Sequence, residues 1–217
     1  MKNHTRERPI AGIRRWAVGL AAVAGLLIGQ TALAAPLGLD LLPLGPGSDP
    51  DIFAGLGNVT YTAATDSLVV SAQPQTIFSG GASNGITAGL SDFSLTATID
   101  DFGNLVGGAL SISGVVPALG FNSGTLLTGN LTNFGFGGAG SVLEWEFNVT
   151  GGDAAGLWGG QLGGVILGGS GFGGSWGSDF SASFTATADV GIVPEPSTVL
   201  LLGIGLSGLA LRGRARR

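Results

Sequence analysis

The chain has 217 residues, of which 44% are hydrophobic and 42 are glycine, with a formal net charge of -5 and no cysteine. Its nine Lys and Arg residues lie only at 2–15 and 212–217, the single His is His4, and every acidic residue except Glu7 lies between these two basic ends. This distribution excludes nucleic acid as a partner, because phosphate neutralisation needs protein cations, and the lack of cysteine excludes a disulfide framework.

The N-terminus has the order of a secretory signal peptide. A basic region with Arg14 and Arg15 precedes an apolar run at 17–28, and Ala32-Leu33-Ala34 is a small-x-small cleavage site. A first transmembrane helix is the alternative, but the apolar run is too short for one. We therefore expect residues 1–34 to be a signal peptide that signal peptidase removes, which leaves Ala35 as the first residue.

Residues 35–57 are rich in Leu, Pro and Gly without a clear period, and we expect an irregular lead-in segment. From Asn58 the chain alternates between apolar and polar residues, as half-buried strands do. The alternation predicts strands around 59–63, 68–72, 93–99, 105–113, 126–136 in two short pieces, 141–150, 165–167 and 180–190. Gly80-Gly81 and Asn84-Gly85 are typical of turns.

The region 58–192 is therefore expected to be an all-β domain. Short strands separated by Gly and Asn turns favour an antiparallel β-sandwich or jelly roll. A glycine-rich β-solenoid is the rival, but stacked coils need a fixed repeat and the sequence has none.

The residue types between 35 and 196 restrict the chemistry. General base, nucleophile and oxyanion functions commonly use His, Lys, Arg or Cys, and this region has none of them. Glu144 and Glu146 lie two apart on one strand face, about 7 Å from each other by the strand rise, which superficially suits a pair of glycosidase carboxylates. We favour the simpler interpretation that they form the solvent face of an amphipathic strand, and we expect no enzyme activity and no cofactor.

Other polar and aromatic residues suggest binding sites of lower specificity. Asp100, Asp101 and Asp179 are weak candidates for calcium ligands, although none belongs to a complete calcium-binding motif, so solvated turns are the default and no metal is expected. Trp158 and Trp176 lie in glycine-rich loops, where an indole could stack on a sugar ring. Buried anchors that hold the loops are the favoured interpretation.

The C-terminal segment 193–217 has three parts in a fixed order. Pro194-Glu195-Pro196 is followed by an apolar run at 198–211, which as a helix is shorter than the roughly 30 Å hydrocarbon core of a membrane. A basic cluster ends the chain and would hold it on the cytoplasmic side. That cluster consists of Arg212, Arg214, Arg216 and Arg217.

This order resembles the PEP-CTERM sorting signal of exported bacterial proteins. The resemblance implies processing by an exosortase-type enzyme near the Pro-Glu-Pro motif, a precursor held in the inner membrane by the short C-terminal helix, and final delivery to the cell surface or the extracellular space. It also implies an association with exopolysaccharide and biofilm. We therefore expect a non-catalytic exported surface or matrix protein, and the alternative is a carbohydrate-binding or carboxylate-dependent glycan-acting module that carries the same signal.

Overall fold

The computed structural model describes residues 35–39, 41, 50–87, 89, 91–140, 142–184 and 188–193. All of them belong to one unit, Ala34–Arg217. The expected signal peptide with Ala32 and Ala34, the Pro194-Glu195-Pro196 motif, the apolar run and the Arg cluster lie outside the described residues.

The described residues form strands joined by turns and three short 3-10 helices. The strands are β1 (Asp51–Thr62), β2 (Ser67–Ser79), β3 (Ala82–Gly85), β4 (Asp92–Ile99), β5 (Leu105–Val116), β6 (Phe121–Phe136), β7 (Leu143–Gly151), β8 (Gly163–Leu167), β9 (Phe180–Phe184) and β10 (Ala188–Ile192). The 3-10 helices are η1 (Ala63–Thr65), η2 (Pro117–Leu119) and η3 (Ala155–Trp158).

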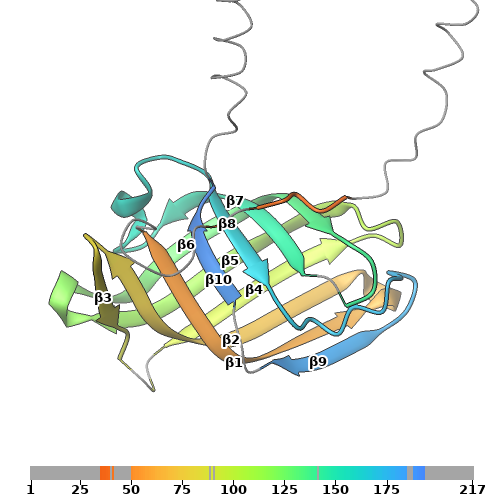
Figure 1. Ribbon diagram of the computed structural model, residues 1–217, viewed down its shortest axis with the longest axis horizontal. Coiled ribbons are helices and arrows are strands. Elements are labelled where there is room, and N and C mark those ends of the chain that lie inside the picture. The colour runs from red at the N-terminus through yellow and green to blue at the C-terminus, as the bar shows by residue number, and fades with distance from the viewer. Residues whose placement is uncertain are drawn as a thin grey trace, which may run out of the picture. The chain divides into compact units, whose positions relative to one another are not determined.

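Eight of the strands close into an antiparallel barrel (Figure 1). Each strand pairs with the next one along the wall in the order β1, β2, β4, β5, β6, β7, β8 and β10, and β10 returns to pair with β1. The short strand β3 extends the edge of β2, and β9 continues the line of β10 along the other half of β1. The expected all-β antiparallel fold is therefore confirmed, whereas the expected sandwich or jelly roll is not. A strand order that follows the chain and then closes makes one continuous wall instead of two facing sheets.

Alternation along each strand fills the interior of the barrel. In β4, for example, Phe93, Leu95 and Ile99 are fully buried while Thr96 and Thr98 are exposed on the outside. The interior of an eight-stranded barrel is just wide enough for side chains to fill it. The largest buried side chains inside this core are Trp145, Trp158, Tyr61, Phe93, Phe147 and Phe172.

Several strand boundaries differ from the sequence-based expectation. Asn84-Gly85 was expected to be a turn but belongs to β3, and β2 extends to Ser79 because β3 pairs with its last residues. β1 begins at Asp51, inside the expected lead-in, because β10 and β2 pair with its first residues. β6 is one long strand instead of two pieces, with bulges that keep it in register with its neighbours. Within the described residues the expected long final strand consists of β9 and β10, which pair with β1 on either side of Leu56, where φ is a left-handed 52°.

Each end of the barrel is covered by a loop that carries a buried tryptophan. β7 and β8 are antiparallel, so the loops that follow them lie at opposite ends. Trp158 ends η3 after β7, and Trp176 follows β8. Trp176 packs against five aromatic rings with centroid distances of 4.6 to 5.6 Å. The five are Tyr61, Phe134, Phe136, Phe172 and Phe180.

The phase of β4 can be tested with a pair of neighbouring substitutions. Leu95→Asn puts an amide among apolar side chains and should lower the free energy of unfolding by about 3 to 5 kcal/mol. Thr96→Asn changes an outward side chain and should lower it by no more than about 1 kcal/mol. Denaturant titration measures both, and equal losses would contradict the register of this wall.

Candidate functional sites

A segment that we call the N-terminal strap, residues 35–39 and 41, lies along the outer wall of the barrel near β7 (Figure 1). The backbone N–H groups of Gly38 and Leu39 donate hydrogen bonds to Oε2 and Oε1 of Glu144, at 2.9 and 3.2 Å. Gly38 has a left-handed φ of 66°, a conformation that turns successive N–H groups toward one anion. Glu144 is thereby only 4% exposed, so its expected position on an open solvent face was wrong.

The strap approaches the wall closely because glycine stands beneath it. A Cβ atom at Gly135, the β6 residue that pairs with Glu144, would lie 2.7 Å from the carbonyl oxygen of Ala35. Any larger residue at this position would therefore push the first residues of the strap away from the barrel. The glycines of the outer wall are thus part of the docking surface for the chain's own N-terminal segment.

The other end of the strap meets the end of the last strand. A Cβ atom at Gly164 of β8 would lie 3.0 Å from Leu41 Cδ2, 3.0 Å from Val193 Cγ2 and 3.2 Å from Leu39 Cδ1. The N–H of Val193 also donates a 3.0 Å hydrogen bond to the carbonyl oxygen of Leu162. Two strap leucines and the residue that follows β10 therefore gather over one small position of the wall.

The pair Glu144 and Glu146 does not form a cleft with either loop tryptophan. Both oxygens of Glu144 accept strap N–H groups, and Glu146 accepts a 3.3 Å hydrogen bond from Asn133 Nδ2. Trp158 is 0% exposed and Trp176 is 3% exposed, so both are buried anchors, as the sequence analysis favoured. These four residues do not form a sugar-stacking surface.

Two of the three weak calcium candidates, Asp100 and Asp179, accept hydrogen bonds from backbone N–H groups, and Asp101 lies in the turn that follows Asp100. Asp100 Oδ1 accepts the N–H groups of Phe102 and Asn104, and Asn104 Nδ2 donates to Asp100 Oδ2 at 2.9 Å. These bonds, the Asn104 side chain first, hold the pKa of Asp100 below its ordinary value. Asp179 Oδ1 accepts the N–H of Ala63 at 2.8 Å. Within the described ranges, no three acidic, His or Cys side chains come together as metal ligands.

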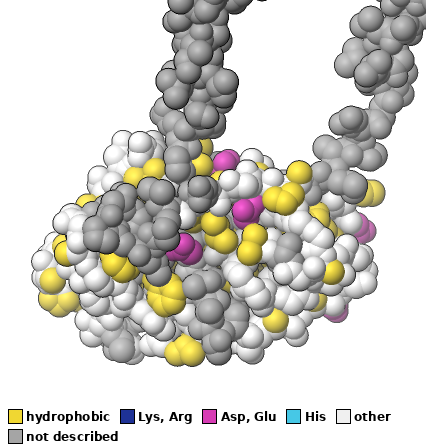
Figure 2. Space-filling view, in the orientation of Figure 1, with side chains coloured by type: hydrophobic (Ala, Val, Ile, Leu, Met, Phe, Trp, Pro, Cys, Tyr) yellow, Lys and Arg dark blue, Asp and Glu magenta, His cyan; other side chains and the backbone are white. Residues whose placement is uncertain are grey.

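These aspartates nevertheless make one end of the barrel acidic. The Tyr61 hydroxyl donates a 2.9 Å hydrogen bond to the carbonyl oxygen of Ile99, and burial, followed by four nearby carboxylates, raises the pKa of Tyr61 to about 12. The four carboxylates belong to Asp66, Asp101, Asp100 and Asp179. On the face in view, Figure 2 shows carboxylates but no Lys or Arg among the described residues, as the sequence from 16 to 211, which has neither, requires.

A second acidic feature, which the sequence analysis did not single out, lies at the seam where the barrel closes. Asp51 of β1 and Asp189 of β10 are diagonal neighbours, two residues apart in the register, because Asp51 pairs with Gly191 and Phe53 pairs with Asp189. Asp51 is only 2% exposed. Burial raises the pKa of Asp189, and the hydrogen bond to Asp51 opposes that shift.

The raised pKa of Asp189 predicts a particular dependence of stability on pH. Folding favours the protonated form of Asp189. Its contribution to the free energy of unfolding is therefore full below the unfolded pKa of about 3.9, and it is lost as the pH rises through the higher pKa of the folded chain. Asp189→Asn should therefore be more stable than the parent at pH 7, and the difference should shrink as pH falls toward 4. Thermal melts of both proteins from pH 7 to pH 4 measure this difference.

Asp153 provides a control of opposite sign. Its Oδ2 accepts the N–H of Ser123 at 2.8 Å, and the hydrogen bonds with Ser123 lower the pKa of Asp153. A carboxyl group whose pKa is lowered by folding stabilises the folded chain at pH values above its unfolded pKa. This stabilisation is lost as the pH falls through its folded pKa. Asp153→Asn should therefore be less stable than the parent at pH 7. If Asp189→Asn also lowered stability at pH 7, the buried carboxyl would be a net stabiliser and our assignment would be wrong.

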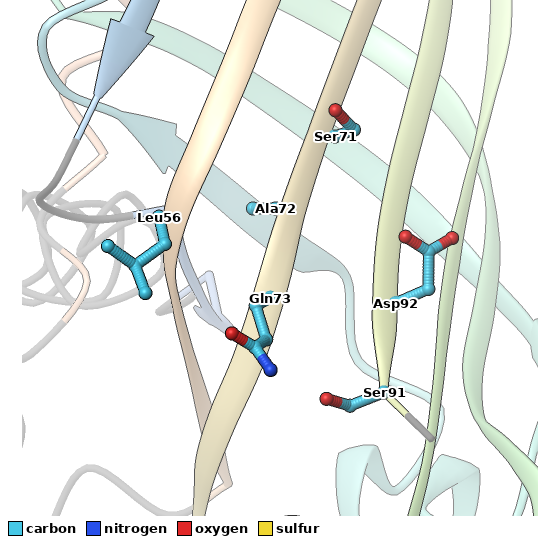
Figure 3. A pocket seen from close by; sticks show the side chains of 6 residues that line it. All are labelled: Leu56, Ser71, Ala72, Gln73, Ser91 and Asp92. Atoms are coloured by element: carbon cyan, nitrogen blue, oxygen red, sulfur yellow. The ribbon is translucent and has the colours of Figure 1, made fainter. Parts of the chain in front are cut away.

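A shallow hollow of about 240 Å³ lies on the outer wall between β1, β2 and the start of β4. Figure 3 shows Leu56 and Gln73 side by side from β1 and β2, with Ser91 pointing back toward Gln73 and Asp92 pointing away. Leu56 is 63% exposed and is one of two non-glycine residues with positive φ in the described chain. Ser71 and Ala72 complete the lining.

The strap, the Asp51–Asp189 pair and the hollow were all missed by sequence reasoning. Each depends on contacts between residues far apart in the chain, and Gly38 lies 106 positions before Glu144. The sequence contains no specific signal for any of them, because Glu144 shares the polar face of an alternating strand with Glu146 and Asn148.

Comparison with known proteins identifies the C-terminal segment. Residues 193–217 match the family model of the PEP-CTERM protein-sorting motif, which confirms the resemblance stated above. The motif implies an exosortase-sorted, exported and surface-directed protein. No curated protein and no solved structure matches this chain. Among the residues that the structure describes, no helix has the length and apolar character needed to span a membrane.

Proposed function

We propose that this chain is a non-catalytic surface or extracellular-matrix protein whose barrel associates with exopolysaccharide after exosortase processing. Export and sorting follow from the motif at 193–217. Two features of the barrel support the non-catalytic role. Its interior is packed with apolar and aromatic side chains, and the sequence from 35 to 193 has no His, Lys, Arg or Cys.

The observation that carries the polysaccharide association is a belt of neutral polar side chains around the outer wall. Six neighbouring strands each contribute one residue with a hydroxyl or amide side chain, and each of these residues pairs in register with the one on the next strand. This hydroxyl belt consists of Ser183, Asn58, Ser71, Ser94, Ser111 and Thr128. All six are exposed or half-buried, and Ser71 also lines the hollow.

The chemistry of the belt suits a neutral polysaccharide. Neighbouring strands are about 4.8 Å apart, so the belt offers a regular row of hydrogen-bond donors and acceptors. Sugar hydroxyl groups have the same dual capacity. An anionic polymer would be repelled, because the mature chain carries carboxylates and no side-chain cation.

The sorting part of this proposal is tested at the motif. Glu195→Ala should retain the full-length precursor in the membrane fraction, whereas the parent chain should appear outside the cell with a shortened C-terminus. Immunoblots of cell fractions and intact mass measurement of the extracellular form give the result. An extracellular protein that still ends at Arg217 would contradict processing.

The binding part is tested by removing hydroxyl groups from the belt. The double change Ser94→Val and Ser111→Val keeps β-forming residues and should weaken cosedimentation with the host's exopolysaccharide by about thirtyfold, since each of the two net hydrogen bonds is worth about 1 kcal/mol. The matched control is Thr60→Val with Thr98→Val, two exposed positions outside the belt. Equal binding by both double variants would show that the belt does not recognise the polymer.

A further inference from the structure

The hollow on the outer wall forms where the pairing of β2 is interrupted on both sides. On the β1 side, Leu56 and Gly57 together oppose the single β2 residue Ala72, which makes a bulge. On the other side, the ladder between β2 and β4 ends at Ala72, and the pairing of β2 with β3 begins only at Thr76. Gln73 therefore lies at a gap in the wall, in the lining of a hollow of about 240 Å³.

Two residues of the hollow are held in unfavourable states. Leu56 has a left-handed φ of 52°, a conformation that suits glycine and strains a larger residue, and it is also 63% exposed. The Oγ atom of Ser91 is buried, and among the described residues it has no hydrogen-bond partner. Such a hydroxyl has lost its bonds to water and gained none in return. Strained and unsatisfied groups of this kind gather at ligand sites, where the bound molecule contacts them.

The lining of the hollow fits a small neutral molecule that has both hydroxyl groups and an apolar face. Figure 3 shows Gln73 between Leu56 and Ser91, so an amide and a hydroxyl stand beside an aliphatic side chain. The amide and the hydroxyl both donate and accept hydrogen bonds, as sugar hydroxyl groups do. The carboxylate of Asp92 beside the hollow disfavours an anionic ligand.

The size and position of the hollow restrict which part of a polymer it can hold. Sites for drug-sized ligands measure about 300 to 1,000 Å³, so a hollow of about 240 Å³ has room for one sugar ring and not for several. Ser71 belongs both to the lining and to the hydroxyl belt. A polymer that follows the belt therefore brings a chain end or a side branch to the hollow.

We propose that the hollow lined by Leu56, Gln73 and Ser91 is a binding site for a single neutral sugar residue, at the end or on a side branch of the polysaccharide. The sugar exchanges hydrogen bonds with the Gln73 amide and the Ser91 Oγ, and its C–H face packs on Leu56. This inference rests on the proposed polysaccharide association and adds the point at which one residue of the polymer is recognised.

The test uses the protein recovered from the medium of the exporting host and a panel of neutral probes. The probes are glucose, galactose, mannose, N-acetylglucosamine and the neutral oligosaccharides that partial acid hydrolysis releases from the host's exopolysaccharide. Saturation-transfer NMR at increasing probe concentration gives the dissociation constants, and at least one probe should bind the parent. Ser91→Ala and, separately, Gln73→Leu should each weaken that binding by about fivefold, the change expected when one net hydrogen bond is lost.

Two controls separate recognition from a structural role. Gln75→Leu changes the next outward residue of β2, which is exposed and outside the lining, and this variant should bind the probe as the parent does. Ser91→Ala removes a hydroxyl that has no partner among the described residues, so its melting temperature should not fall although its affinity does. A loss of affinity that only accompanied a loss of stability would overturn the site.

The outcomes also separate this inference from the proposed function. If no probe bound the parent, or if Gln75→Leu weakened binding as much as Gln73→Leu, the hollow would not be a sugar site, whatever the hydroxyl belt does. The double change Ser94→Val and Ser111→Val leaves the lining intact, so it should keep the affinity for the free probe while it weakens binding of the polymer. Probe binding that depends on Ser91, together with polymer binding that is unaffected by the belt change, would support the hollow and overturn the belt.

Discussion

The pairing of β10 with β1 is the constraint on which the rest of the structure depends. Eight antiparallel strands that follow one another along the chain would leave two open edges, and this one short pairing joins them. Closure turns the apolar face of every strand toward a single enclosed core and removes the edges that promote aggregation. The buried Asp51–Asp189 pair and the last described residue of the strap, Leu41, both adjoin this seam, since Leu41 lies beside Gly191, the partner of Asp51.

Much of the wall could be predicted from the sequence because alternation is a local property. Leu95 and Thr96 differ in polarity, and their neighbours repeat the difference, so the inward and outward faces are readable without knowing which strands pair. Closure into a barrel could not be read in this way, since a sandwich and a barrel demand the same alternation. It depends on whether the last strand reaches the first, which no short stretch of sequence records.

The candidate sites also differ in whether they depend on local sequence or on tertiary contacts. The sorting motif was predictable because its parts are contiguous and their order is specific. Asp100 was recognised as a turn residue for a local reason, since Asn104 follows it at the spacing that a hydrogen-bonded turn uses. Glu144 was misplaced because alternation distinguishes the inside of a wall from its outside, and the outside of this wall is itself covered by another part of the chain. An outward-facing residue can be buried, and only tertiary contact reveals it.

The burial of the tryptophans has a consequence for spectroscopy. Of the four in the chain, Trp16 lies in the expected signal peptide, and removal of residues 1–34 would leave Trp145, Trp158 and Trp176 as the indole fluorophores. All three are at most 3% exposed, and among the described residues none of their indole N–H groups has a hydrogen-bond partner. Their emission therefore originates away from water, from the centre and both ends of the barrel. It reports whether the barrel is intact and is insensitive to what touches its outer wall.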